Sequence, residues 1–329
     1  MQLVINTYGS FLQKEGDLFK VKTEDKVFEV SAKKVNSILI ATAAYLTTDA
    51  IKLAMENNID IIFLNEYGDP YARIWHSKLG STVAIRRKQL EVSFSKEGFE
   101  LAKSWVLTKI ENQINFLERL KKTRGEKVYQ IEEYIQKINE NKEKIKKIEG
   151  LIEEKRASIM ALEGACSKSY FDALSFIMPD RFKFEGRSRN PAKDEFNAML
   201  NYAYGILYSE VEKCCIIAGL DPYIGFLHSD NYNKKSLVFD LIEMYRIFAE
   251  ETVVFLFTKR EIKVEYFDKV KGGLILNKEG RALLIQAYNN NIENTIRYKG
   301  RNIQKKNIIQ FDCHEIANYL LKSELEKGV

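Results

Sequence analysis

Residues 219–246 read GLDPYIGFLHSDNYNKKSLVFDLIEMYR, a stretch that predicts a helix end, a turn, a loop and a second helix. Gly219 is a typical helix stop, and the Asp-Pro pair that follows it prevents the helix from resuming at once. The polar SDNYNKK run predicts a loop before the second helix. Asp240 and Glu243 lie three residues apart on that helix and therefore share one face. The segment that ends in His228 can bring a nitrogen to the same face.

The spacing of these three side chains leaves two interpretations open. In the first, His228, Asp240 and Glu243 converge on a metal ion, and mixed nitrogen and oxygen ligands suit Mg²⁺ or Mn²⁺ better than a thiolate-binding metal. In the second, Asp240 pairs with Lys234 or Lys235, and His228 is a partly buried histidine with a structural role. Short patterns often match by chance, so the spacing alone favours the second interpretation.

A further carboxylate lies upstream, in ASIMALEGACSKSYFDALSFI at residues 157–177. Glu163 stands among small and apolar residues, where a carboxylate is costly unless it is paired or binds a metal. Tyr170 follows seven residues later, two helical turns on and on the same face. An exposed glutamate on the polar side of an amphipathic helix explains the pattern about equally well.

The segment RFKFEGRSRNPAKDEFNAML, at residues 181–200, predicts contact with nucleic acid. Between Arg181 and Lys193 the only acidic residue is Glu185, and two phenylalanines interleave with the basic side chains. Such a loop suits a phosphate backbone and unpaired bases. Its basic residues are Arg181, Lys183, Arg187, Arg189 and Lys193.

The composition and spacing of the sequence change after about Gly80. Before it, short apolar runs alternate with turn signals such as TEDK and YGDP, which predicts a small β-rich domain with one helix. After it, isoleucines from Ile131 to Ile152 follow a 4-3-7-3-4 spacing that predicts one long helix. We therefore expect an α+β protein, with a β-rich domain at 1–85 and a larger all-α domain at 86–329.

Composition limits the class of protein. In the 329-residue chain 45% of residues are hydrophobic and 29% are charged, which predicts a globular protein with a sizeable core. The net charge of +5 permits an anionic partner without requiring one. The four cysteines form no C-x-x-C pair, which argues against a zinc ribbon or a disulfide framework. With no signal-peptide pattern and no apolar run near the ~20 residues that span a membrane, we expect a cytoplasmic protein without membrane contact.

Three stretches together resemble the CRISPR-associated integrase, number one of the Cas series, which inserts new spacers into CRISPR arrays. They are ALEGACSKSYF, RSRNPAKDEFNAMLNYAYGILYSEVEKCCIIAGLDPYIGFLH and SLVFDLIEMYR, in that order. Two departures stand out. The loop reads RNPAKD where family members often have a second proline and no lysine, and Met244-Tyr245 replaces the usual Pro-Phe. These changes bear on loop rigidity and DNA affinity more than on a metal site.

The resemblance implies an N-terminal β domain for dimerisation and partner contacts, followed by an α-helical catalytic domain. It implies that Glu163, His228 and Glu243 are catalytic and hold a Mg or Mn divalent cation, with Asp240 as a nearby or alternative ligand. It also implies DNA contacts near the first carboxylate and in the basic loop. The DNA-binding residues predicted in this way are Tyr170, Arg181, Arg187, Arg189 and Lys193.

The implied reaction is metal-dependent attack of a 3′-hydroxyl on a phosphodiester, with hydrolysis when water is the nucleophile. Integration of both ends of a double-stranded DNA fragment needs two active sites a fixed distance apart. This favours a homodimer, with a second small CRISPR-associated adaptation protein bridging two dimers. The expected DNA partners are the spacer precursor and the CRISPR repeat. Two alternatives are a metal-dependent nuclease or junction resolvase without integration, and a nucleic-acid-binding scaffold without enzymatic activity.

Overall fold

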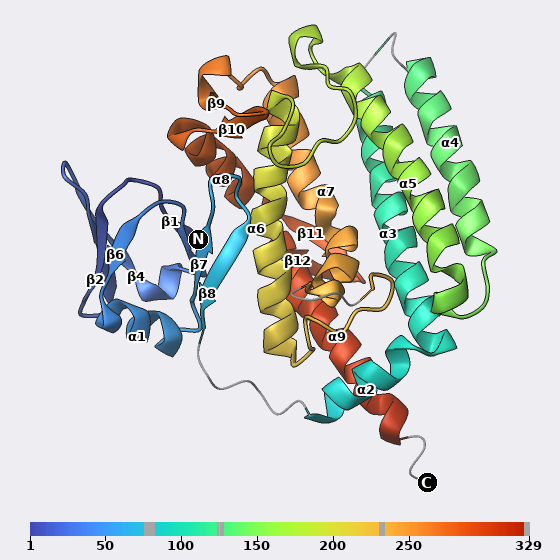
Figure 1. Cartoon of the computed structure of the whole chain (residues 1–329), viewed down its shortest axis with the longest axis horizontal. Coiled ribbons are helices and arrows are strands. Elements are labelled where there is room, and N and C mark those ends of the chain that lie inside the picture. The colour runs from blue at the N-terminus through green and yellow to red at the C-terminus, as the bar shows by residue number, and fades with distance from the viewer. Residues whose placement is uncertain (76–82, 124, 126–127, 230–233, 326–329) are drawn as a thin grey trace.

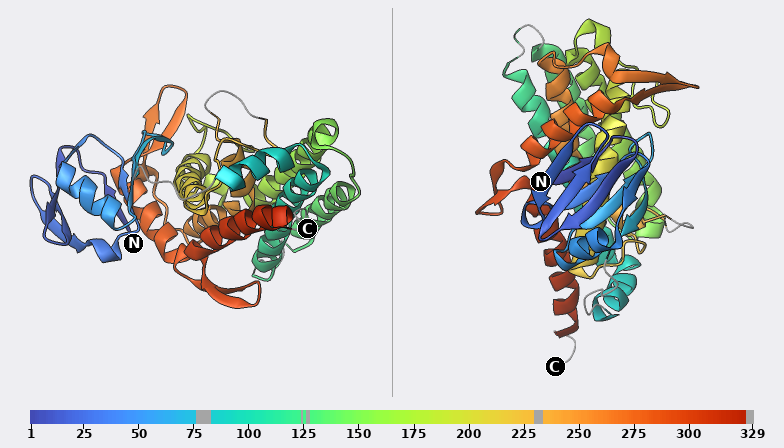
Figure 2. Two further views of the ribbon diagram at one scale, coloured as in Figure 1. Left: turned by 90° about the horizontal axis from the view of Figure 1, so that it is seen from below. Right: turned by 90° about the vertical axis from the view of Figure 1, so that its left-hand side faces the viewer.

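A β-rich N-terminal part stands beside a larger, mostly helical part, as the computed structural model shows (Figure 1). The structure describes the chain except residues 76–82, 124, 126–127, 230–233 and 326–329. The β-rich part forms one end of the molecule in Figure 1 and in the left-hand view of Figure 2. Among the described residues its last strand ends at Ile74 and the first helix of the helical part begins at Val83. The domain boundary at residues 85 and 86 stays a prediction.

Two four-stranded sheets build the N-terminal part. In the first, with order β1-β5-β7-β8, the first three strands are parallel and β8 is antiparallel. The second has order β4-β3-β2-β6, and its core side chains, such as Leu12 and Phe19, are fully buried. The strands are β1 (Gln2–Ile5), β2 (Ser10–Glu15), β3 (Leu18–Lys22), β4 (Val27–Ser31), β5 (Ser37–Ile40), β6 (Ala44–Leu46), β7 (Asp60–Leu64) and β8 (Pro70–Ile74).

The predicted helix of this part is α1 (Thr48–Glu56), which contacts β2 and β7. Its start follows from the sequence, because the Thr47 side chain accepts a hydrogen bond from the Ala50 backbone N–H at 3.2 Å. The predicted hairpin around the TEDK turn is also present as β3 and β4. Strands β2 and β6 were not predicted, because their polar and exposed residues break the alternation that identifies a strand.

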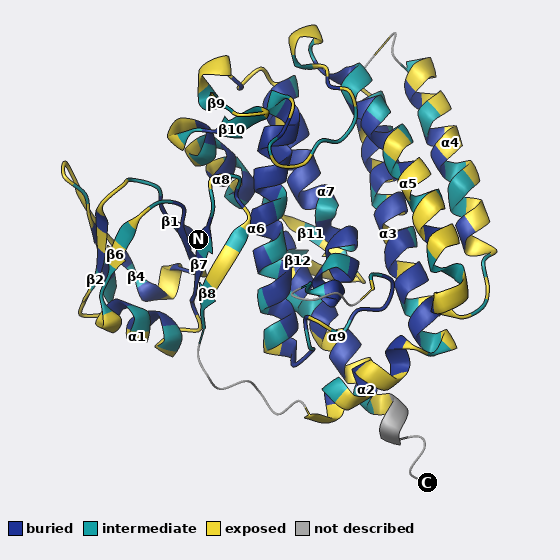
Figure 3. Ribbon diagram, in the orientation of Figure 1, coloured by how far each residue is buried: buried dark blue, intermediate teal, exposed yellow. Residues whose placement is uncertain are grey.

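Eight helices carry most of the rest of the described chain, and the core runs between them (Figure 3). The helices are α2 (Val83–Ser93), α3 (Lys96–Lys121), α4 (Val128–Lys146), α5 (Ile152–Ile177), α6 (Glu195–Ala218), α7 (Ser236–Thr258), α8 (Lys278–Ile292) and α9 (Lys305–Leu325). Two hairpins, β9 (Phe267–Val270) with β10 (Gly273–Leu276) and β11 (Thr295–Tyr298) with β12 (Arg301–Gln304), project from opposite sides of the helical part (Figure 2). The predicted α+β class is confirmed, because a strand-rich N-terminal part precedes a mostly helical part, to which these hairpins add short strands.

The isoleucine seam belongs to two helices rather than one. Ile131, Ile135 and Ile138 are buried on α4, as predicted. The helix ends at Lys146, however, and α5 begins at Ile152, so the chain turns back and α4 packs against α5 and α3 (Figure 1). The seam is therefore covered within the chain and needs no coiled-coil partner.

Helix α6 joins the two parts because the β7–β8 turn lies directly on it. A Cβ added at Gly205 would lie 2.0 Å from the Gly68 carbonyl oxygen, so only glycine permits this approach. From the adjacent strand, the Arg73 guanidinium donates to the Ser209 carbonyl at 2.7 Å. The contact places Asp69 and Pro70 at the edge of a cavity in the helical part.

Two further expectations concern redox chemistry and membranes. All four cysteines are buried and unpaired, as expected for a chain without a disulfide framework. Within the described part of the chain, no helix is both long enough and apolar enough to cross a membrane.

Candidate metal and nucleic-acid site

Helix α3 packs against both α5 and α7, and this arrangement brings two of the predicted ligands to one point. Glu163 comes from α5 and Glu243 from α7, and both bind the ammonium of Lys109 on α3. The Lys109 Nζ lies 2.5 Å from Glu243 Oε2 and also donates to Glu163 Oε1. The same oxygen of Glu163 accepts a hydrogen bond from Ser167 Oγ at 2.8 Å, one helical turn away.

Glu243 is buried, and its charge is balanced by two cations. Its Oε1 accepts hydrogen bonds from Arg246 Nε at 3.0 Å and Nη2 at 2.8 Å. Burial alone would raise the pKa of Glu243, but Arg246 and Lys109 outweigh it and lower the pKa to about 2. Burial would likewise lower the pKa of Lys109, but Glu243 and Glu163 outweigh that effect and raise it. The two charges are therefore fixed at neutral pH.

His228 is held by Asp240 on α7. The imidazole Nδ1 lies 2.7 Å from Asp240 Oδ1, and because a carboxylate can only accept, Nδ1 carries the hydrogen. The same carboxylate accepts the backbone N–H groups of Phe226, Leu227 and His228 at 2.6, 3.1 and 2.9 Å. The second ring nitrogen, Nε2, is then the one available to a ligand. Asp240 thus fixes the GFLH segment, and its four hydrogen bonds do not fit a role as an alternative metal ligand.

Neither Lys234 nor Lys235, both in the described part of the chain, pairs with Asp240. Lys235 instead forms an ion pair with Glu212 at 2.6 Å, and Lys234 lies over the Phe239 ring. Asp240 therefore orients His228, whereas Glu243, further along the same helix, meets Glu163 of α5 at Lys109.

The donor types suit a hard divalent cation, since two carboxylates and one imidazole nitrogen are ligands that Mg²⁺ or Mn²⁺ accepts. Glu243 Oε2 is buried and makes no well-directed hydrogen bond, although it lies 2.5 Å from Lys109 Nζ. Within the described residues, however, no three His, Cys, Asp or Glu side chains are grouped closely enough to hold a metal ion. The ammonium of Lys109 takes the position between the two glutamates.

The basic loop lies beside this cluster, and its members differ in exposure. Arg187 turns inward: it donates to the side-chain oxygens of Asn197 and Asn201, the latter at 2.7 Å, and lies over the rings of Phe171 and Tyr204. Burial lowers the pKa of its guanidinium. The remaining predicted DNA-binding residues of the loop are exposed: Arg181, Arg189 and Lys193.

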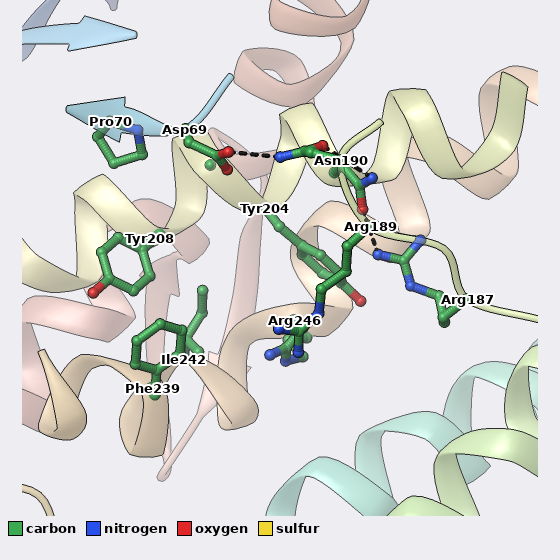
Figure 4. Close-up of a pocket in the computed structure, with 12 residues that line it drawn as sticks. Asp69, Pro70, Arg187, Arg189, Asn190, Tyr204, Tyr208, Phe239, Ile242 and Arg246 are labelled. Carbon is green, nitrogen blue, oxygen red and sulfur yellow. Dashed lines mark hydrogen bonds between the residues drawn. The ribbon is translucent and has the colours of Figure 1, made fainter. Parts of the chain in front are cut away.

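A cavity of about 540 Å³ lies between the loop, α6, α7 and the β7–β8 turn (Figure 4). Three arginines line it, Arg187, Arg189 and Arg246, together with Tyr204, Tyr208 and Phe239. Positive charge beside aromatic rings suits phosphates and unpaired bases. The cavity adjoins the site, because Arg246 binds Glu243 and the Phe239 ring lies 5.8 Å from that of His228.

Tyr170 lies elsewhere than predicted. Its side chain is fully buried, and its hydroxyl donates to Glu250 Oε2 at 2.9 Å. Tyr204 donates to the other oxygen of the same carboxylate at 2.6 Å. The helical spacing places Tyr170 on the face of Glu163, but the Tyr170 side chain lies in the protein interior, where it reaches Glu250 of α7. The position is at odds with direct DNA contact in this conformation.

Sequence reasoning missed Lys109 and Arg246. A signal for Lys109 exists, because Trp105, Lys109 and Gln113 are spaced by four residues and all three are buried on one face of α3. A lysine on a buried face needs an acidic partner. For Arg246, the signal is its spacing of three residues from Glu243.

The comparisons with known proteins agree on one family. The sequence matches the model of the family described as CRISPR associated protein Cas1 over residues 3–290. It is 33% identical over 333 residues to a protein of Archaeoglobus fulgidus named CRISPR-associated endonuclease Cas1 1, with 97% of this chain and 96% of the relative covered.

Two solved structures share the fold. A casposase bound to its integration product has a TM-score of 0.84 at 22% identity and covers 98% of this chain and 91% of its own. A Cas6-RT-Cas1–Cas2 complex has a TM-score of 0.80 at 19% identity and covers 98% of this chain and 35% of the other.

Proposed function

Because the chain belongs to the Cas1 family, we propose that it is a divalent-metal-dependent DNA integrase and endonuclease that inserts new spacers into CRISPR arrays. One observation carries the proposal. Glu163 and Glu243, from different helices, face a single cation beside a cavity lined by arginines, and His228 is held by Asp240 on the same helix as Glu243.

Glu163, Glu243 and Nε2 of His228 would hold Mg²⁺ or Mn²⁺, which supplies polarisation of the scissile phosphate and activation of a 3′-hydroxyl or water. The protein's own task is then positioning and charge neutralisation. Asp240 keeps the imidazole turned so that Nε2 is presented. Arg246 stabilises the ionised form of Glu243.

The DNA is proposed to enter along the arginine-lined cavity. Arg187 is fixed in place by Asn197 and Asn201, so its guanidinium is a rigid feature of the cavity wall. Arg189 is exposed at the rim and free to meet a phosphate. Tyr208 and Phe239, whose ring centroids lie 5.2 Å apart in the cavity wall, offer aromatic surface where an unpaired base can stack.

Integration of both ends of one fragment requires two such sites, and we propose a homodimer bridged by a second small adaptation protein. Support comes from the second N-terminal sheet, whose outer face exposes Phe11 and Tyr45 side by side on the paired strands β2 and β6. Further support comes from the similar solved complex, which contains Cas2.

The test is a strand-transfer assay with Mn²⁺ or Mg²⁺, a labelled short duplex, a plasmid carrying a CRISPR repeat, and the candidate partner protein. Joining of the label to the plasmid that depends on metal and is lost in His228→Ala is the expected result. Cleavage without joining would favour the nuclease or junction resolvase. DNA binding without chemistry in the wild-type protein would favour the scaffold.

A further inference from the structure

The cation between Glu163 and Glu243 is the side-chain ammonium of Lys109. Lys109 is buried on α3, and its ammonium binds Glu163 from α5 and Glu243 from α7. Two carboxylates that contact the same ammonium repel each other, and the charge of the buried Glu243 would be costly without a partner, whereas Glu163 is partly exposed. The lysine therefore balances charges that would otherwise separate these helices.

The ammonium and a divalent cation would compete for the same oxygen atoms. Lys109 engages Oε1 of Glu163 and Oε2 of Glu243, while Arg246 occupies the other oxygen of Glu243. Hence Arg246 can stay in place when a metal binds, but the Lys109 ammonium cannot keep both of its contacts. A lysine side chain has rotatable bonds along its whole stem, so it can withdraw without a movement of the helix.

We propose that Lys109 is a resident counter-cation: it holds the two glutamates together in the metal-free protein and is displaced when the divalent metal binds. The inference rests on the proposed metal site. Its consequence is that the metal affinity of the protein is set by competition with its own lysine, so the wild-type site binds metal more weakly than its ligands alone would.

The experiment is calorimetric titration of Mn²⁺ into Lys109→Met and the wild-type full-length protein, without DNA. Met keeps the length and apolar stem of the side chain but removes the charge. We expect Lys109→Met to bind Mn²⁺ at least about tenfold more tightly, because the repulsion between the glutamates is then relieved only by the metal. The metal-free variant should have a lower Tm than the wild type, and Mn²⁺ should raise its Tm by more.

Lys103→Met is the matched control. Lys103 is buried on the same helix, but its ammonium pairs with Glu100 at 2.8 Å and with the Ile148 carbonyl at 3.1 Å, away from the glutamate pair. This variant should lose stability without a change in Mn²⁺ affinity. Adding Glu163→Gln to Lys109→Met should abolish the gain, which assigns the tighter binding to this site.

Equal or weaker Mn²⁺ binding by Lys109→Met would overturn the proposal, as would an absence of binding to either protein. If Lys109→Met does not fold, Lys109→Gln takes its place in the titration. A crystal structure of the wild-type protein soaked in Mn²⁺ then tests displacement directly. A Lys109 ammonium that still contacts both glutamates beside bound metal would contradict displacement. Because binding is measured without DNA, loss of strand transfer alone would refute the proposed function and leave this result standing.

Discussion

At the scale of single residues, Asp240 determines where the imidazole of His228 lies. Its two oxygens receive four hydrogen bonds from the segment that precedes the helix, and its side chain is almost fully buried. A carboxylate fits this place because every group that faces it is a donor. The same residue therefore closes the loop and selects the ring nitrogen that is presented to a ligand.

Asp240→Asn tests this role. One oxygen becomes an NH₂ group that faces N–H donors, so we expect a loss of about 2–4 kcal/mol in the free energy of unfolding. Misorientation of His228 should lower the strand-transfer rate by about tenfold or more. Urea unfolding and the transfer assay measure the two effects.

Asp221→Asn is the control for that substitution. Asp221 lies in the same loop, and its Oδ1 accepts a hydrogen bond from the Tyr223 N–H at 3.0 Å, which an asparagine oxygen can still accept. Asp221→Asn should therefore leave the free energy of unfolding and the strand-transfer rate nearly unchanged. An Asp240→Asn protein of wild-type stability and activity would show that the aspartate does not orient the histidine.

At the scale of elements, the sequence predicted those features that depend on neighbouring residues: helix caps, turns and the buried faces of helices. The Thr47 cap, the TEDK hairpin and the buried isoleucines of α4 followed from propensity and spacing. The break between α4 and α5 did not, because the isoleucine spacing continues through it and Gly150 alone signals the turn. Periodicity identifies the buried face of a helix, but it does not say what covers that face.

The candidate site shows the same limit. Glu163 and Glu243 were predicted to share a site, and they do share a cation, but the cation is Lys109 from a third helix. Tyr170 was predicted to face DNA, but its side chain is buried and its hydroxyl binds Glu250 of α7. Contacts between distant segments depend on tertiary packing, which one sequence does not reveal without a resemblance to follow.

The basic loop is the element whose prediction is most directly testable. Arg189 is exposed at the rim of the cavity, so Arg189→Ala should weaken DNA binding severalfold with little effect on folding. If Arg189 contacts one phosphate, the slope of log affinity against log salt should decrease by about 0.9. Fluorescence anisotropy of a labelled duplex across a salt series gives both values.

Lys183→Ala serves as the control within the same loop. Lys183 is exposed too, but its ammonium pairs with Asp180 at 2.7 Å. Its removal should change the slope less. Equal changes for the two variants would mean that the loop attracts DNA by its net charge rather than through Arg189.

At the scale of the whole molecule, the joint between the two parts contains an acid with an unusual pKa. Glu210 on α6 accepts hydrogen bonds from Gln2 Nε2 of the N-terminal sheet at 3.0 Å and from the Tyr288 hydroxyl of α8 at 2.7 Å. Burial raises its pKa from 4.5 to about 7, and the opposing effects of Tyr288 and Lys213 are smaller. Asp60, which also faces this joint, acts in the same direction as burial.

The sign of the resulting pH dependence follows from linkage. Between pH 4.5 and about 7 the folded protein keeps the proton on Glu210 while the unfolded chain has lost it. The free energy of unfolding should therefore fall by up to about 3 kcal/mol as pH rises through this window. At higher pH the ionisation of Glu210 should add little further change. Glu210→Gln keeps the shape and a hydrogen-bonding side chain but cannot ionise, so its stability should lack this decline.

Urea unfolding of both proteins at a series of pH values isolates the effect, because every other titrating group is shared. A wild-type curve that falls relative to that of Glu210→Gln between these pH values is the expected outcome. If the two proteins show the same dependence of stability on pH, Glu210 ionises normally in the folded protein. Water would then reach its carboxyl group at the joint. The N-terminal sheet and the helical part would then be free to separate locally, since water would have reached the side chains between them.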